Sequence, residues 1–245
     1  MMIQFKKMNF NRIRSIALGL MFVILGLIAN PSFANPGDHN HRTPKADQKT
    51  TIYQHNHVPI ETIQLAESLK QGGYTIFFRH ERTTMTEILR DRLPYNFENC
   101  EGQRMLSPAG IASSQETGLA FKILNIPIET VLTSPICRSK DTAQLAFKQV
   151  KVTNQLMVQN AVLKRTKEDV DRDFKALVNQ PHSPNQNIVL IGHLGNVMPI
   201  KELPSEGEAI VLKPDGKLGV TVVGRILAAQ WGDIVRDIDR AKTPT

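Results

Sequence analysis

The sequence has few cysteines, few aromatic residues and no long apolar run after its N-terminal segment. Cysteine occurs only twice in 245 residues, and aromatic residues make up 6% of the chain. After Ile28 no segment is apolar over the roughly 20 residues that a membrane-spanning helix needs. No internal repeat is visible, and basic residues are not densely interleaved with aromatic ones as in many nucleic-acid-binding surfaces. These absences favour one globular domain of ordinary size.

The first 34 residues have the three parts of a secretory signal peptide. A basic segment without acidic residues comes first, thirteen apolar residues follow from 16 to 28, and Ser32 and Ala34 are small residues suited to a cleavage site. Thirteen apolar residues are too few for a spanning helix. We therefore expect cleavage after Ala34, no stable membrane span, and a periplasmic or secreted protein.

The basic character of the chain comes largely from this leader. Residues 1–34 contain four of the 30 basic residues and none of the 23 acidic ones, so the net charge falls from +7 to +3 without them. A net positive charge of only +3 gives little support to binding of nucleic acid. We expect no nucleic-acid partner.

Residues 35–59 read as a flexible polar linker, because they contain almost nothing to bury. Two His-x-His pairs occur here, His39 with His41 and His55 with His57. Neutral imidazole can ligate metals, but no cysteine or carboxylate completes a defined set. We expect no metal site and no cofactor.

Residues 60–240 form the predicted folded domain, in which apolar runs typical of strands alternate with helical patterns. This order predicts an α/β three-layer sandwich, with a largely parallel sheet and helices on both faces. A polar insertion is expected at 81–104. Helices are predicted at 61–71, 107–124, 138–147 and 167–179, with a short one ending at 198; strands are predicted at 74–79, 128–134, 155–158, 187–192 and, as a hairpin, 209–212 and 218–223.

Three predicted strands end in residues suited to phosphate chemistry. Arg79 and His80 close the first, a segment ending in Arg138 follows the second, and His193 closes the fourth. The carboxyl ends of parallel strands meet at one edge of a sheet, where ligands bind. Guanidinium groups match phosphate oxygens, and a neutral imidazole can act as a nucleophile. The sequence therefore predicts a site for a phosphoryl group.

These motifs resemble the histidine phosphatase superfamily, also called phosphoglycerate-mutase-like. The resemblance rests on Arg79-His80, on Ser134-Pro135-x-Cys137-Arg138-x3-Thr142-Ala143, and on Gly192-His193-x-x-Asn196. Two further segments resemble an exported bacterial branch: Asn99-Cys100-x-x-Gln103-Arg104-x-Leu106-Ser107-x-x-Gly110, and Gly207-Glu208-Ala209 running into Lys213-Pro214-Asp215-Gly216.

The resemblance implies that His80 is the nucleophile and forms a phosphohistidine. It also implies that Arg79, Arg138 and His193 form the phosphate pocket and that no metal takes part. The substrate would be a small phosphorylated compound, and analogy with phosphatases of the lipopolysaccharide core suggests an envelope sugar phosphate. A mutase is disfavoured, because its sugar-phosphate substrates are cytosolic.

The sequence departs from the family pattern in its acidic residues. Leu194 follows His193, so the His-Asp pair of the acid-phosphatase branch is absent and the proton donor must lie elsewhere. Glu208 is the preferred candidate and Glu81 the second, whereas Glu168 and Asp169 are more distant alternatives. Without a competent acid, the alternative function is a non-catalytic phosphate- or anion-binding protein.

Five further residues have a predicted role or leave alternatives open. Cys100 and Cys137 flank the predicted site and form either a disulfide or two free thiols. Arg104, with its neighbour Gln103, is either a substrate contact or a helix-entry residue, and Trp231 is interpreted as a packing residue of the C-terminal segment.

Overall fold

The computed structural model describes residues 58–84, 91, 94–160 and 163–242. The predicted signal peptide, nearly all of the predicted linker and both His-x-His pairs lie outside these ranges. Within them, no helix is both long and apolar enough to cross a bilayer.

A six-stranded sheet forms the centre of the domain, in the order β3-β2-β4-β1-β5-β6. Parallel pairing joins β1 to β4, β4 to β2 and β2 to β3, whereas β5 runs antiparallel to both of its neighbours. The predicted largely parallel sheet is confirmed. The strands are β1 (Thr75–Arg79), β2 (Ile128–Thr133), β3 (Lys151–Val152), β4 (Asn187–Gly192), β5 (Ala209–Pro214) and β6 (Val220–Ile226).

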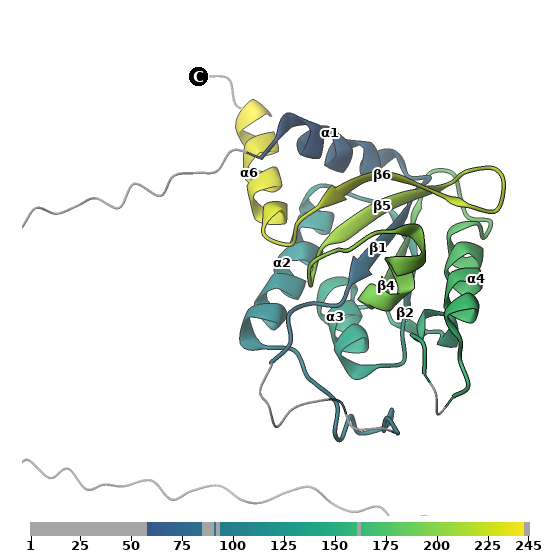
Figure 1. Ribbon diagram of the computed structural model, residues 1–245. Coiled ribbons are helices and arrows are strands. Elements are labelled where there is room, and N and C mark those ends of the chain that lie inside the picture. The colour runs from purple at the N-terminus through teal and green to yellow at the C-terminus, as the bar shows by residue number, and fades with distance from the viewer. Residues whose placement is uncertain (1–57, 85–90, 92–93, 161–162, 243–245) are drawn as a thin grey trace, which may run out of the picture. The chain divides into compact units, whose positions relative to one another are not determined.

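Helices cover both faces of the sheet (Figure 1). On one face lie α1 (Ile60–Ser68), α2 (Pro108–Ile123), α3 (Cys137–Phe147) and α6 (Gln230–Lys242); on the other lie α4 (Lys167–Val178) and the short α5 (Leu194–Val197). The three-layer sandwich is therefore confirmed.

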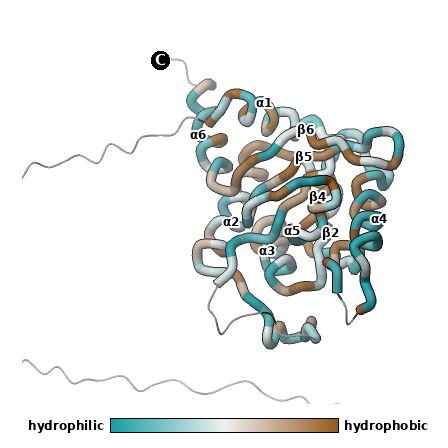
Figure 2. The backbone as a smooth tube through the Cα atoms, viewed as in Figure 1, coloured by the Kyte–Doolittle hydropathy of each residue, from teal (hydrophilic) through white to brown (hydrophobic). Residues whose placement is uncertain are grey.

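Neighbouring residues of β1 serve the two opposite cores, because side chains alternate along a strand. Phe78 packs against Phe121 and Trp231 on the α2 and α6 side, whereas the Phe77 ring lies 5.5 Å from that of Phe174 in α4. Trp231 is fully buried, which confirms its predicted packing role. Figure 2 shows hydrophobic residues along β4 and β5 and mostly hydrophilic ones on the outward side of α4.

Local signals explain where α2 begins. The Ser107 hydroxyl accepts a hydrogen bond from the backbone N–H of Gly110, and Pro108 occupies the first turn. A serine cap stabilises a helix start, and proline fits there because its missing N–H would have no partner inside the helix.

Two elements differ from prediction. The prediction of a strand at 155–158 is wrong, because Asn154–Leu156 form a 3₁₀ turn. The Thr153 hydroxyl caps this turn by accepting a hydrogen bond from the N–H of Gln155, and strand β3 lies before it in the sequence. Helix α6 was not predicted, although its apolar residues Trp231, Ile234 and Ile238 have helical spacing.

A disulfide joins Cys100 to Cys137, with 5.9 Å between their Cα atoms. The sequence left open a disulfide or two free thiols, and the structure has the disulfide. It ties the polar insertion to the first residue of α3, directly before Arg138.

Candidate active site

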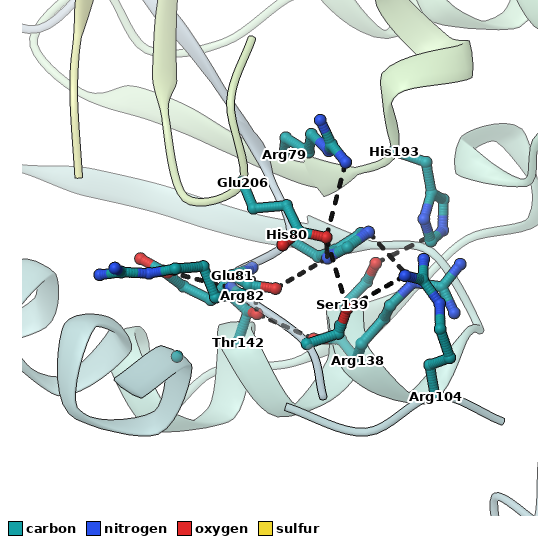
Figure 3. Close-up of polar contacts among 12 residues, drawn as sticks. Arg79, His80, Glu81, Arg82, Arg104, Arg138, Ser139, Thr142, His193 and Glu206 are labelled. Atoms are coloured by element: carbon teal, nitrogen blue, oxygen red, sulfur yellow. Dashed lines mark hydrogen bonds and ion pairs between the residues drawn. The ribbon is translucent and has the colours of Figure 1, made fainter. Parts of the chain in front are cut away.

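The sheet brings the predicted strand ends to one edge. Arg79 lies beside Gly192 in the parallel register of β1 and β4, so His80 and His193 leave adjacent strands side by side. Their ring centroids are 5.3 Å apart. Strand β2 flanks β4 on the other side and leads to α3, which carries Arg138 to the same place (Figure 3). The structure thus brings four of the five predicted site residues together.

His80 is buried and neutral. Its Nδ1 lies 2.9 Å from the carbonyl oxygen of Glu81, and a carbonyl can only accept a hydrogen bond, so Nδ1 carries the proton. Its Nε2 accepts a hydrogen bond from Nε of Arg138 at 3.1 Å. Burial, followed by the charge of Arg138, lowers the pKa of His80 to about 3. Nε2 is therefore unprotonated at neutral pH, and its lone pair can act as a nucleophile once the Nε–H of Arg138 releases it.

Arg138 spans two partners inside the site. While its Nε bonds to His80, its Nη1 donates to Oδ1 of Asp91 at 3.1 Å. The same Asp91 oxygen accepts from the backbone N–H of Arg104 at 2.8 Å. Sequence reasoning missed Asp91, because it lies in the polar insertion, where no periodicity or motif distinguishes it from other acidic residues.

His193 is fixed from two sides. Its backbone N–H donates to Oδ1 of Asn196 at 2.7 Å, and its Nε2 lies 2.9 Å from the Ser134 hydroxyl. Burial, followed by the proximity of His80, lowers the pKa of His193 well below its usual value. Its Nδ1 is buried and has no hydrogen-bond partner among the described residues. A buried polar atom without a partner is uncommon and often marks a functional site.

Arg79 faces the pocket from β1 and is held by the loop before β5. Its Nη1 donates to the carbonyl oxygen of Pro204 at 3.0 Å, and its Nη2 lies 3.5 Å from Oε1 of Glu206. The Arg79 Nε is a second buried donor that no described residue satisfies.

Glu206 brings a carboxylate close to His80. Besides its contact with Arg79, its Oε1 lies 3.4 Å from the Thr83 hydroxyl and 4.0 Å from Nδ1 of His80. Figure 3 shows its side chain directed between Arg79 and His80. The sequence analysis did not single out Glu206.

Glu208, the acid preferred from the sequence, has structural partners. Both of its carboxylate oxygens are engaged, Oε1 by Nε of Arg225 at 2.6 Å and Oε2 by the backbone N–H of Ser205 at 2.7 Å. This carboxylate therefore fastens the start of β5 to β6.

The other candidate acids also have structural partners. Oε1 of Glu81 accepts from the Ser113 hydroxyl at 2.6 Å, and burial raises the pKa of this carboxyl group. Asp169 forms a capping box with Thr166 at the start of α4, and Glu168 lies in the same first helical turn.

A glycine makes the turn between Glu206 and Glu208. Gly207 has a φ of +79°, and its N–H lies 3.1 Å from the carbonyl oxygens of both Arg79 and His80. A Cβ atom at this position would lie 2.3 Å from a carboxylate oxygen of Glu81. Both the backbone angle and the close approach require glycine.

Gln103 and Arg104 have different roles. Gln103 is structural, because its Oε1 accepts from the N–H of Cys137 at 2.9 Å. Arg104 reaches the site: its Nη1 donates to the Thr83 hydroxyl at 3.1 Å, and its guanidinium lies beside that of Arg138 in Figure 3.

Comparisons with known proteins give likenesses of fold. No family model matches the chain, and no curated protein matches it. The protein histidine phosphatase SixA, solved with tungstate, is 16% identical with a TM-score of 0.47, covering 64% of this chain and 98% of SixA. A mycobacterial glucosyl-3-phosphoglycerate phosphatase is 15% identical, with a TM-score of 0.40 over 57% of this chain and 89% of its own.

A third similar structure is a phosphoserine phosphatase of Entamoeba histolytica in complex with phosphoserine. It is 13% identical, with a TM-score of 0.43, and the match covers 62% of this chain and 95% of that one. All three are described as phosphatases. At this level of similarity they carry no inference about the substrate of this chain.

Proposed function

We propose that the protein is an exported phosphomonoesterase of the histidine phosphatase superfamily and that it works through a phosphohistidine on His80. The observation that carries the proposal is the state of His80. Its proton is held on Nδ1 by a carbonyl oxygen, and its unprotonated Nε2 faces the Arg138 guanidinium in a buried site. A neutral imidazole nucleophile beside several cationic donors suits attack on a dianionic phosphoryl group.

In the first step, the Nε2 lone pair of His80 forms a bond to phosphorus while the bond between phosphorus and the ester oxygen breaks. Arg79, Arg104 and Arg138 offset the charge on the phosphoryl oxygens. The departing alkoxide receives a proton through the Glu206 carboxyl group and leaves as an alcohol.

In the second step, water attacks the phosphorus of the phosphohistidine and loses a proton to the Glu206 carboxylate. The bond between phosphorus and Nε2 breaks, and inorganic phosphate leaves. The enzyme returns to its starting state, with His80 neutral and the proton that passed through Glu206 in the first step restored. Glu206 is given this role because it lines the same cavity as Arg79 and Arg104.

Trapping the intermediate tests the proposal. Purified protein is mixed with phosphorus-labelled p-nitrophenyl phosphate, quenched in alkaline detergent within milliseconds and digested for mass spectrometry. We expect label on His80 and none in His80→Ala. His182→Ala is the matched control, because His182 bonds to the carbonyl oxygen of Gln180, away from these strand ends, and should leave labelling unchanged.

Two outcomes would contradict this function. Hydrolysis by His80→Ala within about tenfold of wild type, a barrier change of only ~1.4 kcal/mol, would exclude His80 as the nucleophile. Phosphate binding without label or turnover would favour the alternative, a non-catalytic anion-binding protein. Export is tested separately, by cell fractionation and N-terminal sequencing, which should find a chain that begins at Asn35.

A further inference from the structure

A cavity of about 570 Å³ has Glu206 in its wall, and Oε1 of Glu206 lies 4.0 Å from Nδ1 of His80. Arg79, Arg82 and Arg104 line it together with Glu206, and residues 227–229 form an apolar wall. Pockets of a few hundred cubic ångströms hold entire small molecules. The cavity is thus larger than a phosphoryl group requires, and its remaining space is available to the rest of the substrate.

The charge of this cavity exceeds what one phosphoryl group needs. Among the residues that the structure describes, three guanidinium groups and one carboxylate, that of Glu206, line it. Arg79 contacts Glu206, and Arg104 contacts Thr83 near Arg138. These two arginines can therefore serve the phosphoryl group that reacts at His80.

Arg82 differs from the other two arginines. It is exposed, and its side chain extends in Figure 3 away from the Arg104 and Arg138 guanidinium groups. Its backbone N–H donates to Glu81, but its guanidinium makes no hydrogen bond or ion pair with any residue of the described ranges. Apart from the effect of its charge on the neighbouring Glu81 carboxyl group, no interaction with a described residue accounts for an arginine at this wall of the cavity.

We propose that the substrate carries a second anionic group, a carboxylate or a further phosphate, and that Arg82 binds it. This inference rests on the proposed function, because it takes His80 as the position of the reacting phosphoryl group. A guanidinium is suited to either anion through paired hydrogen bonds. The apolar wall formed by Leu227, Ala228 and Ala229 would contact the carbon skeleton between the two anions. The substrate class is therefore a phosphate monoester with an acidic group at its far end.

Binding calorimetry can test this without turnover. The protein carries His80→Asn, and the probes are three six-carbon compounds: glucose 6-phosphate, 6-phosphogluconate and glucose 1,6-bisphosphate. The second adds a carboxylate and the third a phosphate at the end remote from the shared phosphoryl group. We expect at least one doubly anionic probe to bind tenfold or more tightly than glucose 6-phosphate, and the better of the two identifies the anion.

Adding Arg82→Gln should reduce that preference to less than threefold. Adding Arg240→Gln instead is the matched control, because it removes one arginine charge from the exposed side of α6 and should leave the preference intact. Equal affinity for all three probes, no binding of any probe at millimolar concentration, or a preference that survives Arg82→Gln would overturn the proposal. An Arg82-dependent preference in a protein that never forms phosphohistidine would instead refute the phosphatase function alone.

Discussion

The Nε of Arg138 lies 3.1 Å from Nε2 of His80, so the guanidinium donates to the nitrogen that is proposed to attack phosphorus. The contact keeps that nitrogen unprotonated and occupies its lone pair, so the guanidinium must release Nε2 when a phosphoryl group enters. Its second partner, Asp91, accepts from Nη1 of the same guanidinium. Before substrate binds, Arg138 is therefore held in place by its two neighbours.

Substitution of Arg138 should damage turnover severely. Arg138→Ala removes a charged donor from a buried site, and we expect kcat for p-nitrophenyl phosphate to fall by about 10²–10³-fold. Arg138→Lys should recover only part of this loss, because a point charge cannot contact Nε2 and a carboxylate together as the fork does. Steady-state kinetics of both variants provide the measurement, and full activity of the lysine variant would contradict a shaped contact.

The roles of Glu206 and Glu208 can be distinguished with substrates whose leaving groups differ in their need for a proton. Glu206→Gln should slow hydrolysis of a sugar phosphate by tenfold or more beyond its effect on p-nitrophenyl phosphate, because p-nitrophenolate departs without a proton and an alkoxide does not. Glu208→Gln is the matched control: it perturbs the contact with Arg225 and should affect both substrates alike. An equal effect of Glu206→Gln on the two substrates would assign Glu206 a positioning role.

Stability should fall as the pH is lowered from 6.5. The unfolded chain binds a proton at histidine near pH 6.5, whereas folded His80 remains neutral until about pH 3. The stability that this difference contributes is fully present above pH 6.5 and is lost as the pH falls toward 3, by up to about 1.4 kcal/mol per pH unit. Urea unfolding of wild type and His80→Asn measures the slope, which should be shallower in the variant; identical slopes would contradict the depressed pKa.

The disulfide should contribute to stability. The two cysteines are 37 positions apart in the sequence. For a loop of this length, chain entropy predicts a contribution of about 4 kcal/mol to the free energy of unfolding. The double variant Cys100→Ser with Cys137→Ser should therefore have a Tm lower by roughly 5–15 °C. Reduction should lower the Tm of wild type in the same way and leave that of the variant unchanged. A wild-type Tm insensitive to reductant would exclude the bridge.

Gly207 should tolerate no side chain. Gly207→Ala combines a positive φ with a Cβ 2.3 Å from the Glu81 carboxylate, and we expect destabilisation by about 2–4 kcal/mol with at least tenfold lower kcat. Gly216→Ala is the control, because Gly216 has a φ of +77° with nothing near its missing Cβ. Similar losses in the two variants would show that the backbone angle alone, and not the contact with Glu81, requires glycine.

The sequence predicted the residues that lie at strand ends. Arg79, His80 and His193 each close an apolar run, and once the strands are parallel their ends must meet. The fold class followed from the same alternation of strands and helices. Most predicted elements lie within a few residues of their observed positions, because caps such as Ser107 fix them locally.

Site residues that lie in loops could not be predicted from strand ends. Glu206 and Glu208 are two positions apart, and the choice between them depends on the positive φ of Gly207 and on a partner, Arg225, in a different strand. Asp91 reaches Arg138 from an insertion that has no periodicity. A single sequence contains neither of these long-range contacts.

The reversed direction of β5 has a consequence for how this site can vary. Because β5 runs antiparallel to β1, its first residue, Ala209, lies beside Phe78 near the end of β1. The loop that enters β5 therefore opens at the same edge as the nucleophile, although it follows β4 and α5 along the chain. Insertions or deletions there would move the Glu206 carboxylate while leaving the histidines and the strands in place. The proposed proton donor, Glu206, can thus change position without a change in the proposed nucleophile, His80.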